Sequence, residues 1–312
     1  MKVLITGGLG QVGSHVAELL LARGDQVLAI DNLATGRRDH LLPQQGLEVV
    51  IDTIADQKVV DDLFARFQPE VVVHTAASYK DPEDWYNDAL TNVVGGANLV
   101  KAATANKVRR FIYFQTALCY GLKPLQQPIR LDHPKFPANS SYAISKTAAE
   151  DYLEISGQEF VTFRLANVIG PRNVSGPLPI FYQRLTEGKR CFVTKARRDF
   201  VFVKDLARYV VKAVDGMGSG TYHFSSGKDI AIQELYDAVV AGLQLSDSPA
   251  PDVRELGPDD APSILLDPSR TFKDFGQVDF TPLNQLVAEA VAYYREYGVH
   301  GGYTHLRHEE KK

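Results

Sequence analysis

The stretch Thr6-Gly7-Gly8-Leu9-Gly10-Gln11-Val12-Gly13 decides the fold expected for this chain. It joins an apolar run at 2–6 to a helical pattern at 11–23, so its glycines fall in a strand-to-helix turn. Glycines without Cβ atoms let backbone N–H groups approach a diphosphate at the positive end of the helix. This context predicts a dinucleotide-binding unit. The expected contacts are Gly7, Gly10, Gln11, Val12 and Gly13.

An acidic residue at the end of the second expected strand supports a dinucleotide. Asp31, followed by Asn32, lies 18 residues past Gly13. A carboxylate at this position accepts both ribose hydroxyls and repels a 2′-phosphate, which favours NAD over NADP. Arg37 and Arg38 follow closely and could instead hold a 2′-phosphate.

The ends of the next two expected strands add further candidate cofactor contacts. Asp52, followed by Thr53, ends the third strand where an adenine-contacting carboxylate would lie. It could equally be the N-cap of the next helix. The small residues Ala76 and Ala77 close the fourth strand and leave room for a cofactor, whereas His74 is interpreted as a hydrogen-bonded strand-end histidine.

Alternating strand and helix patterns predict an α/β protein with a Rossmann-type doubly wound parallel sheet. The expected strands are 2–6, 26–30, 47–51, 71–74, 110–116 and 160–165, and the expected helices are 11–23, 56–67, 82–105 and 140–155. Beyond Gly170 the prolines at 171, 177 and 179 argue against regular elements. A strand at 200–203, a helix at 205–214, a strand at 221–225, helices at 232–243 and 282–297 and a proline-rich loop at 248–262 follow.

These segments divide into two expected parts and a tail. Residues 1–168 plus 198–226 would form the NAD-binding domain. Residues 169–197 plus 227–300 would form a smaller, discontinuous α/β substrate-binding lobe. Residues 301–312 are polar and are expected to form a flexible tail.

Composition limits the function classes. The 312 residues are 45% apolar and 23% charged with a net charge of −4, so a nucleic-acid partner is not expected. Apolar runs are too short to span a bilayer, and no secretory signal follows Met1, which predicts a cytoplasmic protein without a membrane partner. Cys119 and Cys191 lack metal-ligand spacing, so no metal is expected.

Tyr142 and Lys146 stand four residues apart on an expected helix and form the candidate catalytic pair. A lysine ammonium one turn away stabilises a phenolate and so lowers the pKa of the tyrosine toward neutrality. Such a tyrosine can accept the proton of a carbinol while a nicotinamide takes the hydride. Thr116 ends the fifth strand at the same edge and could hydrogen-bond the reacting oxygen.

These motifs resemble the extended short-chain dehydrogenase/reductases, specifically the nucleotide-sugar epimerase/dehydratase branch. The resemblance implies that Thr116, Tyr142 and Lys146 are the catalytic triad, with Tyr142 and Lys146 also touching the cofactor. The motifs that carry it are Thr6–Gly13, Asp31–Leu33, His74–Ala77, Asn92-Val93, Thr116–Gly121, Tyr142–Lys146, Arg164–Pro171, Arg198–Asp205 and Asp267–Arg270.

The same resemblance implies roles for residues around the substrate. Asn92 would be the structural asparagine of the central helix, counted with the cofactor site. Asn167 and Arg198 would hold the nucleotide diphosphate. Because Gly257 stands near the expected second phosphate-binding arginine, Arg254 or Arg172 could replace it by position.

Departures from the family pattern narrow the expected reaction. Ala117 and Leu118 follow Thr116 at the substrate side, where the 4,6-dehydratases of the branch carry an acid, and neither can transfer a proton. The resemblance therefore implies an NAD-dependent 4-epimerase acting on a nucleotide-diphosphate sugar through a 4-keto intermediate, with UDP as the commonest nucleotide of the branch.

Two other functions stay open. A 4-ketoreductase or dehydrogenase would use the same residues but exchange its cofactor each turnover, and a non-catalytic dinucleotide-binding regulator could be built on the same fold. The resemblance also implies a homodimer through the helices 82–105 and 140–155. It extends to epimerase-like enzymes of bacterial O-antigen clusters, which points to lipopolysaccharide biosynthesis. The sugar and the direction of flux are not specified.

Overall fold

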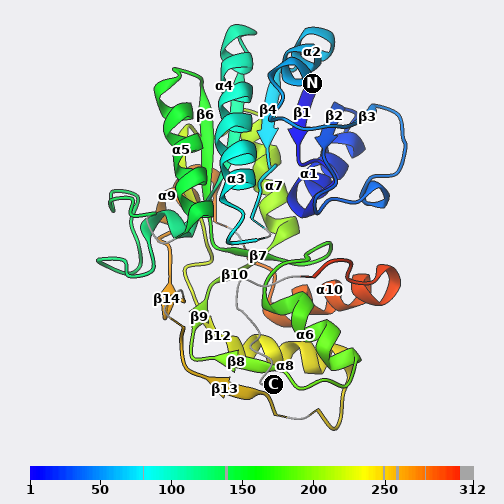
Figure 1. The fold of residues 1–312 in the computed structure, drawn as a ribbon, viewed down its shortest axis with the longest axis vertical. Coiled ribbons are helices and arrows are strands. Elements are labelled where there is room, and N and C mark those ends of the chain that lie inside the picture. Colours follow the sequence, from blue (N-terminus) through cyan, green and yellow to red (C-terminus); the bar gives the residue numbers. More distant parts are fainter. Residues whose placement is uncertain (80, 138–139, 249, 258–259, 278, 303–312) are drawn as a thin grey trace.

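The computed structural model describes residues 1–302 except 80, 138–139, 249, 258–259 and 278; most of the expected flexible tail, 303–312, lies outside the described residues. Figure 1 shows a large α/β layer structure with a smaller lobe beneath it. Seven parallel strands form the main sheet in the order β11-β6-β5-β4-β1-β2-β3. They are β1 (Lys2–Thr6), β2 (Gln26–Asp31), β3 (Leu47–Ile51), β4 (Val71–His74), β5 (Arg110–Thr116), β6 (Phe160–Leu165) and β11 (Gly220–Phe224). This confirms the Rossmann-type doubly wound sheet.

Helices cover both faces of the sheet because its strands are apolar on both sides. On one face α1 (Gln11–Ala22) packs against α7 (Val203–Val214), and on the other α2 (Gln57–Phe67), α4 (Gly96–Ala105) and α5 (Ser141–Ile155) pack side by side (Figure 1). Each face has its own buried apolar cluster, with Val16 and Val210 in one and Phe64 and Leu99 in the other.

The helix expected at 82–105 begins three residues late and is interrupted. Asp84 caps α3 (Trp85–Asp88), and the chain then passes through the π-helical turn η2 (Ala89–Gly95) into α4. A π turn adds one residue to the repeat, so positions before and after it no longer share a face. Trp85, which precedes the π turn, is 65% exposed, whereas Leu99, which follows it, is buried.

The smaller lobe contains elements that the sequence did not reveal. The helix α6 (Pro177–Thr186) begins at a proline in its first turn, where the missing N–H would have no partner, so the expectation of irregular chain there was wrong. The helices α8 (Ile232–Leu243) and α10 (Leu283–Tyr297) match the expected ones closely, and α9 (Ser269–Phe275) was not expected. Side chains from α6, α8 and α10 share a third buried cluster.

Several two- and three-residue strands complete this region, one of them inside the expected proline-rich loop. The strand expected at 200–203 pairs only with β7, outside the main sheet, so the chain rejoins the large layer with α7. These strands are β7 (Asn167–Ile169), β8 (Phe192–Thr194), β9 (Arg197–Arg198), β10 (Phe200–Phe202), β12 (Ile230–Ala231), β13 (Asp252–Arg254) and β14 (Ser263–Ile264). Across the described residues, every helix is too short or too polar to cross a bilayer.

The sheet register brings the functional strand ends to one edge. Thr6 at the end of β1 lies beside Ile30 of β2 and His74 of β4, and His74 lies beside Tyr113 of β5. Because parallel strands end at the same edge, the residues that follow them face a common crevice above the smaller lobe.

Candidate active site

A cavity of about 1810 Å³ runs along this carboxyl edge and continues to the smaller lobe. Typical pockets for one small molecule measure roughly 300 to 1,000 Å³, so this cavity has room for a dinucleotide and a second ligand. Its wall includes the glycine turn at one end, the helix start at 140–146 in the middle, and residues of β8, β9 and β13 at the other end.

The glycines of the turn have two distinct roles. Gly7 has φ +64°, and a Cβ atom there would lie 2.7 Å from the backbone nitrogen of Ala76. Gly7, Gly10, Gln11 and Val12 line the cavity, as expected for a phosphate cradle. Gly13 is not part of the cavity wall: its Cβ would lie 2.4 Å from the Gly7 oxygen, so it permits helix–strand packing. The cavity wall therefore does not support the expectation that Gly13 contacts the cofactor directly.

Gln11 also offers an uncommitted hydrogen-bond donor at the cradle. Its Oε1 accepts from Asn173 Nδ2 at 3.3 Å. Among the described residues neither Gln11 Nε2 nor Asn173 Oδ1, both buried, has a hydrogen-bond partner. Buried polar groups without partners are costly, so these atoms fit a polar ligand such as the diphosphate or ribose of a dinucleotide.

Asp31 lies where a ribose would be recognised. Its Oδ2 accepts from Leu9 N at 3.0 Å and its Oδ1 from Leu33 N at 2.8 Å, while burial raises the pKa of its carboxyl. Arg37, the possible ligand of a 2′-phosphate, is paired with Asp39 and, like Arg38, is not part of the cavity wall. The donors and acceptors present therefore fit NAD better than NADP.

The other expected contacts at the adenosine end and along the sheet lie in the cavity wall. They are Asn32, Asp52, Thr53, Ala76 and Ala77. Asp52 does not cap the next helix, because Asp56 occupies that position and accepts from Lys58 N at 2.8 Å. The alternative interpretation of Asp52, as the N-cap of the next helix, is therefore wrong.

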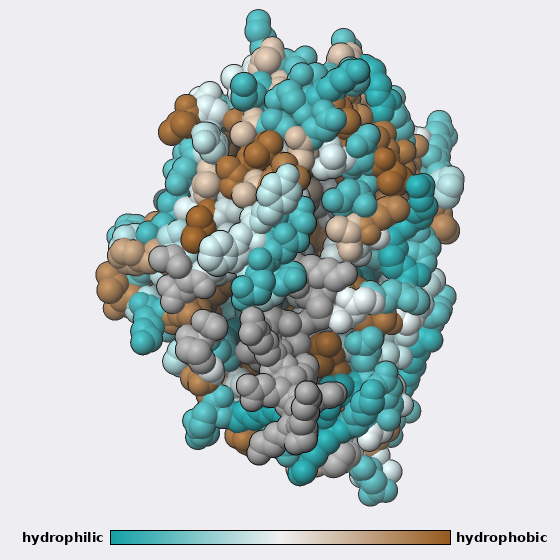
Figure 2. Space-filling view, viewed as in Figure 1, coloured by the Kyte–Doolittle hydropathy of each residue, from teal (hydrophilic) through white to brown (hydrophobic). Residues whose placement is uncertain are grey.

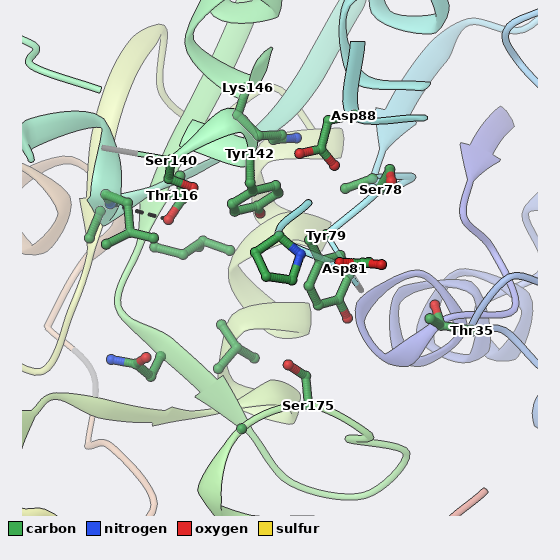
Figure 3. A pocket seen from close by; sticks show the side chains of 18 of the residues that line it. Thr35, Ser78, Tyr79, Asp81, Asp88, Thr116, Ser140, Tyr142, Lys146 and Ser175 are labelled. Atoms are coloured by element: carbon green, nitrogen blue, oxygen red, sulfur yellow. Dashed lines mark hydrogen bonds between the residues drawn. The ribbon is translucent and has the colours of Figure 1, made fainter. Parts of the chain in front are cut away.

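Tyr142 and Lys146 point from consecutive turns of α5 into the cavity (Figure 3). Burial lowers the pKa of Lys146 to about 7, against the opposing effect of Glu150. Burial raises the pKa of Tyr142, and Tyr79 and Asp88 act in the same direction. The pKa of Tyr142 is therefore raised in this structure, contrary to the expected lowering, because desolvation disfavours the phenolate.

Thr116 reaches the same cavity from the end of β5, as Figure 3 shows. Its hydroxyl accepts from Leu118 N at 3.2 Å, which places Ala117 and Leu118 beside it in the cavity wall. The three candidate catalytic residues therefore come from one strand end and one helix, as the topology predicted.

Asn92 lies behind the cavity wall. Its Oδ1 accepts from Ser78 N at 2.9 Å, and its Nδ2 donates to Ser78 O at 3.0 Å and Ser145 Oγ at 2.9 Å. It ties the segment after β4 to α5, which is a structural role. Its place among the direct cofactor contacts is corrected.

The substrate side keeps three of the four expected polar residues. Asn167, Arg198 and Arg254 line the cavity. Arg198 Nη1 donates to Ala261 O at 2.7 Å and its Nη2 pairs with Asp260. Arg254 lies 4.0 Å from the centre of the Phe192 ring.

Arg172 is the exception among these polar residues. Its guanidinium bonds Ser14 Oγ at 3.0 Å and Glu18 Oε1 at 2.5 Å on α1, outside the cavity wall. These contacts use two of the five N–H donors of Arg172, and its predicted role as a substrate ligand has no support in the cavity wall.

Among the wall residues that sequence reasoning did not single out, three are polar and contact or act on the predicted ones. Tyr79, whose ring centre lies 5.8 Å from that of Tyr142, and Asp88 follow β4, and Asp260 accompanies Arg198. The rule that residues after parallel strands face the ligand would have found Tyr79. Asp260 depends on a non-local pairing between β9 and β14.

Two other potentially reactive side chains, Cys119 and His74, are held in their uncharged forms by burial. Burial raises the pKa of Cys119 to about 12, so its thiol stays protonated. His74 Nδ1 bonds Thr6 Oγ1 at 2.7 Å, and burial together with Lys146 lowers its pKa, which keeps it neutral. Within the described residues no group of three or more metal-ligating side chains occurs.

Comparison with known proteins identifies the family. A model of the NAD dependent epimerase/dehydratase family matches residues 3–223. The chain belongs to this family. Membership of an NAD dependent epimerase/dehydratase family confirms the expected cofactor, NAD, and the resemblance drawn from the motifs.

Solved structures of this family and a sequence relative match almost the whole chain. The Bordetella bronchiseptica enzyme WbmH in complex with NAD+ is 71% identical with a TM-score of 0.94, over 96% of this chain and 99% of that one. WbmG of the same organism, in complex with NAD and UDP, is 42% identical with a TM-score of 0.88, over 98% of each chain. A UDP-glucose 4-epimerase of Mycolicibacterium smegmatis is 31% identical, over 95% of this chain and 99% of the relative.

Proposed function

We propose that the protein is an NAD-dependent UDP-sugar 4-epimerase. The observation that carries this proposal is the convergence of Thr116, Tyr142 and Lys146 on one large cavity that begins at the glycine turn. The similarity to a UDP-glucose 4-epimerase and to an enzyme solved with NAD and UDP supports the same reaction.

In this proposal each side chain has a defined part. Thr116 hydrogen-bonds O4 of the sugar, and Tyr142 as phenolate accepts the proton of the 4-hydroxyl. Lys146 as ammonium stabilises that phenolate, whose formation is opposed by burial and by Tyr79 and Asp88. When bound, NAD takes up the hydride from C4 and later returns it.

Inversion requires the 4-keto sugar to turn over inside the cavity. The nucleotide would stay anchored at Arg198 and Asn167 while the ketone rotates about its diphosphate, so that the opposite face meets the returning hydride. Tyr142 then gives its proton back to O4. Ala117 and Leu118 beside Thr116 offer no acid for elimination, which favours epimerisation over dehydration.

The experiment incubates the purified protein with UDP-glucose, UDP-N-acetylglucosamine and the corresponding uronic acids, and follows C4 inversion by NMR. Cofactor released by acid is measured by chromatography. We expect an inverted product and NAD carried through purification. Steady release of NADH with oxidised sugar and no inverted product would contradict the proposal and favour the dehydrogenase alternative.

NAD selectivity has its own test at Asp31. The variant Asp31→Asn keeps an acceptor for Leu9 N but removes the charge that repels a 2′-phosphate. We expect it to exchange bound NAD for NADP in excess NADP, unlike the wild type. The matched control is Asp62→Asn, on the exposed side of α2 and outside the cavity wall. Equal NADP uptake by both variants would remove Asp31 from this role.

We further propose a cytoplasmic homodimer formed through α5 and the helix before it, with a role in surface polysaccharide assembly. Ile144, Tyr152 and Ile155 on α5 and Val94 in η2 are exposed apolar side chains. Figure 2 shows brown residues among the polar surface on the upper half of the molecule, where α4 and α5 lie in Figure 1. Light scattering on wild type and Ile155→Asp tests this: the wild type should be dimeric and the variant monomeric.

A further inference from the structure

A buried ion pair lies directly behind the candidate catalytic helix turn. Glu150, fully buried on α5, follows Lys146 by one helical turn. Its Oε1 accepts from Arg164 Nε at 3.1 Å and its Oε2 from Arg164 Nη2 at 3.1 Å. This two-pronged contact joins α5 to β6, and such pairs are geometrically specific.

A second contact leads from the same carboxylate to the catalytic strand end. Gln115, 1% exposed, donates from Nε2 to Glu150 Oε2 at 3.1 Å. Its Oε1 accepts from Thr116 N at 2.8 Å. Gln115 lies beside Arg164 in the sheet register, so both side chains reach the same carboxylate.

We propose that Glu150 is a positioning residue for proton transfer: through Gln115 it fixes the backbone of Thr116, and along α5 it supplies the counter-charge of Lys146. This inference rests on the proposed function, because it assigns a supporting role to the residues that hold the proton. Neither the family match nor the motifs that carry the resemblance single out Glu150 or Gln115.

The position of the lysine makes this counter-charge important. Lys146 is buried beside the Tyr113 ring on β5 and near the neutral His74 on β4. Asp88 on α3 faces the same cavity and acts on the neighbouring Tyr142. Burial lowers the pKa of Lys146 to about 7, and Glu150 opposes that decrease. Without the carboxylate a larger fraction of the lysine would lose its proton at neutral pH.

Glu150 itself is surrounded by hydrogen-bond donors. Besides Arg164 and Gln115, Lys135 from the loop before α5 places Nζ 3.4 Å from Oε2. Asp151 and Glu154 on α5 face Lys135 and share its charge. Tyr113 and Cys119 also lie within its field, both protonated because burial raises the pKa of each.

The far end of the network anchors Arg164 away from the cavity. Arg164 Nη1 donates to Tyr120 OH at 2.6 Å, and Tyr120 OH bonds His223 Nε2 at 2.6 Å. Tyr120 is not part of the cavity wall. Tyr120 is therefore a suitable control position, because substituting it perturbs the Glu150–Arg164 pair but leaves the contacts from Glu150 through Gln115 to Thr116 in place.

The first experiment compares Gln115→Met with Tyr120→Phe. Gln115→Met removes the link to Thr116 but leaves the Glu150–Arg164 pair. We expect kcat for C4 inversion to fall on the order of tenfold or more, as small displacements of reacting groups do, with KM and NAD content near wild type. Tyr120→Phe should keep kcat within about threefold of wild type. Equal kcat in both variants would overturn the positioning of Thr116.

The second experiment tests the charge with the double variant Glu150→Gln, Arg164→Met. Removing both charges avoids leaving a buried arginine without its partner. The alkaline limb of the kcat profile, on which Lys146 loses its proton, should move to lower pH than in wild type. An unmoved limb in a variant that keeps its NAD and its thermal stability would overturn the counter-charge role.

A measurement without substrate separates this inference from the proposed reaction. Lysine labelled with ¹³C at Cε is titrated by NMR, with the Lys146 signal assigned from Lys146→Met. The lysine should titrate at lower pH in the double variant than in wild type. If the wild type inverts no UDP-sugar but this shift is present, the proposed function fails and the role of Glu150 stands. If the wild type inverts a UDP-sugar but the shift is absent, the proposed function stands and the counter-charge role of Glu150 fails.

Discussion

The hydroxyl of Tyr113 donates to the backbone oxygen of Lys146 at 2.8 Å, and the Nζ atom of Lys146 lies 4.2 Å from the centre of the Tyr113 ring. The strand β5 therefore contacts both the backbone and the charged end of the catalytic lysine. An aromatic face stabilises an ammonium without neutralising it, so the cation stays available to a phenolate on the next turn.

The buried lysine predicts a pH-dependent stability. Because its pKa falls from 10.5 to about 7 on folding, the unfolded chain binds one more proton between these values. The free energy of unfolding should then rise with pH, by up to about 1.4 kcal/mol per pH unit from this group. Lys146→Met should lose that slope between about pH 7.5 and 9, as measured by urea unfolding at matched NAD content.

Lys101→Met is the control for this slope, because Lys101 is exposed on α4. It should follow the wild-type pH dependence. If Lys146→Met keeps the wild-type slope, the lysine is not held in a desolvated, proton-poor state, and the electrostatic account of the site fails with it.

Loss of the phenol should abolish proton transfer but not cofactor binding. Tyr142→Phe is expected to reduce C4 inversion by roughly 10²-fold or more, as removal of a general base does. NAD released by acid should match wild type, since the ring itself remains. Tyr152→Phe, the same change on the exposed part of α5, should leave turnover unchanged. Near-normal turnover in Tyr142→Phe would remove Tyr142 from its role.

The sequence alone predicted those elements of the fold that depend on local patterns of apolar residues and glycines. Long apolar strands such as β5, and the glycines that follow β1, predicted the sheet and the cofactor end of the cavity. Topology then placed Thr116, Tyr142 and Lys146 together, because strand ends and the following helix starts share one edge.

The remaining features depend on contacts that no local pattern encodes. Two-residue strands such as β9 carry no periodic signal, and the π turn η2 interrupts the helical repeat expected over 82–105. Arg172 resembled a phosphate ligand by position, but its partner Glu18 lies 154 residues away. The link from Glu150 through Gln115 to Thr116 needs the register of β5 against β6, which only the folded chain defines.

The cradle of the glycine turn can be tested with two matched glycines of positive φ. Gly7→Ala places a Cβ 2.7 Å from Ala76 N, whereas a Cβ at Gly24, with φ +90°, meets nothing within 4 Å. Both variants should lose about 1–2 kcal/mol from the left-handed backbone. Only Gly7→Ala should also lose bound NAD, measured by chromatography after acid release. Retention of NAD in Gly7→Ala would show that this wall of the cavity does not contact the cofactor.

Two adjacent arginines, one in the cavity wall and one outside it, allow the role of Arg198 in nucleotide binding to be tested against a matched control. Arg198 lies in the cavity wall, where Asp260 and the Ala261 oxygen orient its guanidinium, while Arg197 points to Asp229 outside the wall. A charged hydrogen bond contributes about 1.5–3 kcal/mol, so Arg198→Met should raise KM for the UDP-sugar by roughly tenfold or more. Its kcat should change less, because Arg198 lies on β9 and the proton-transfer residues lie on α5. Arg197→Met should keep the wild-type KM. Equal KM values in the two variants would mean that the diphosphate is held elsewhere, with Arg254 on β13 the next residue to substitute.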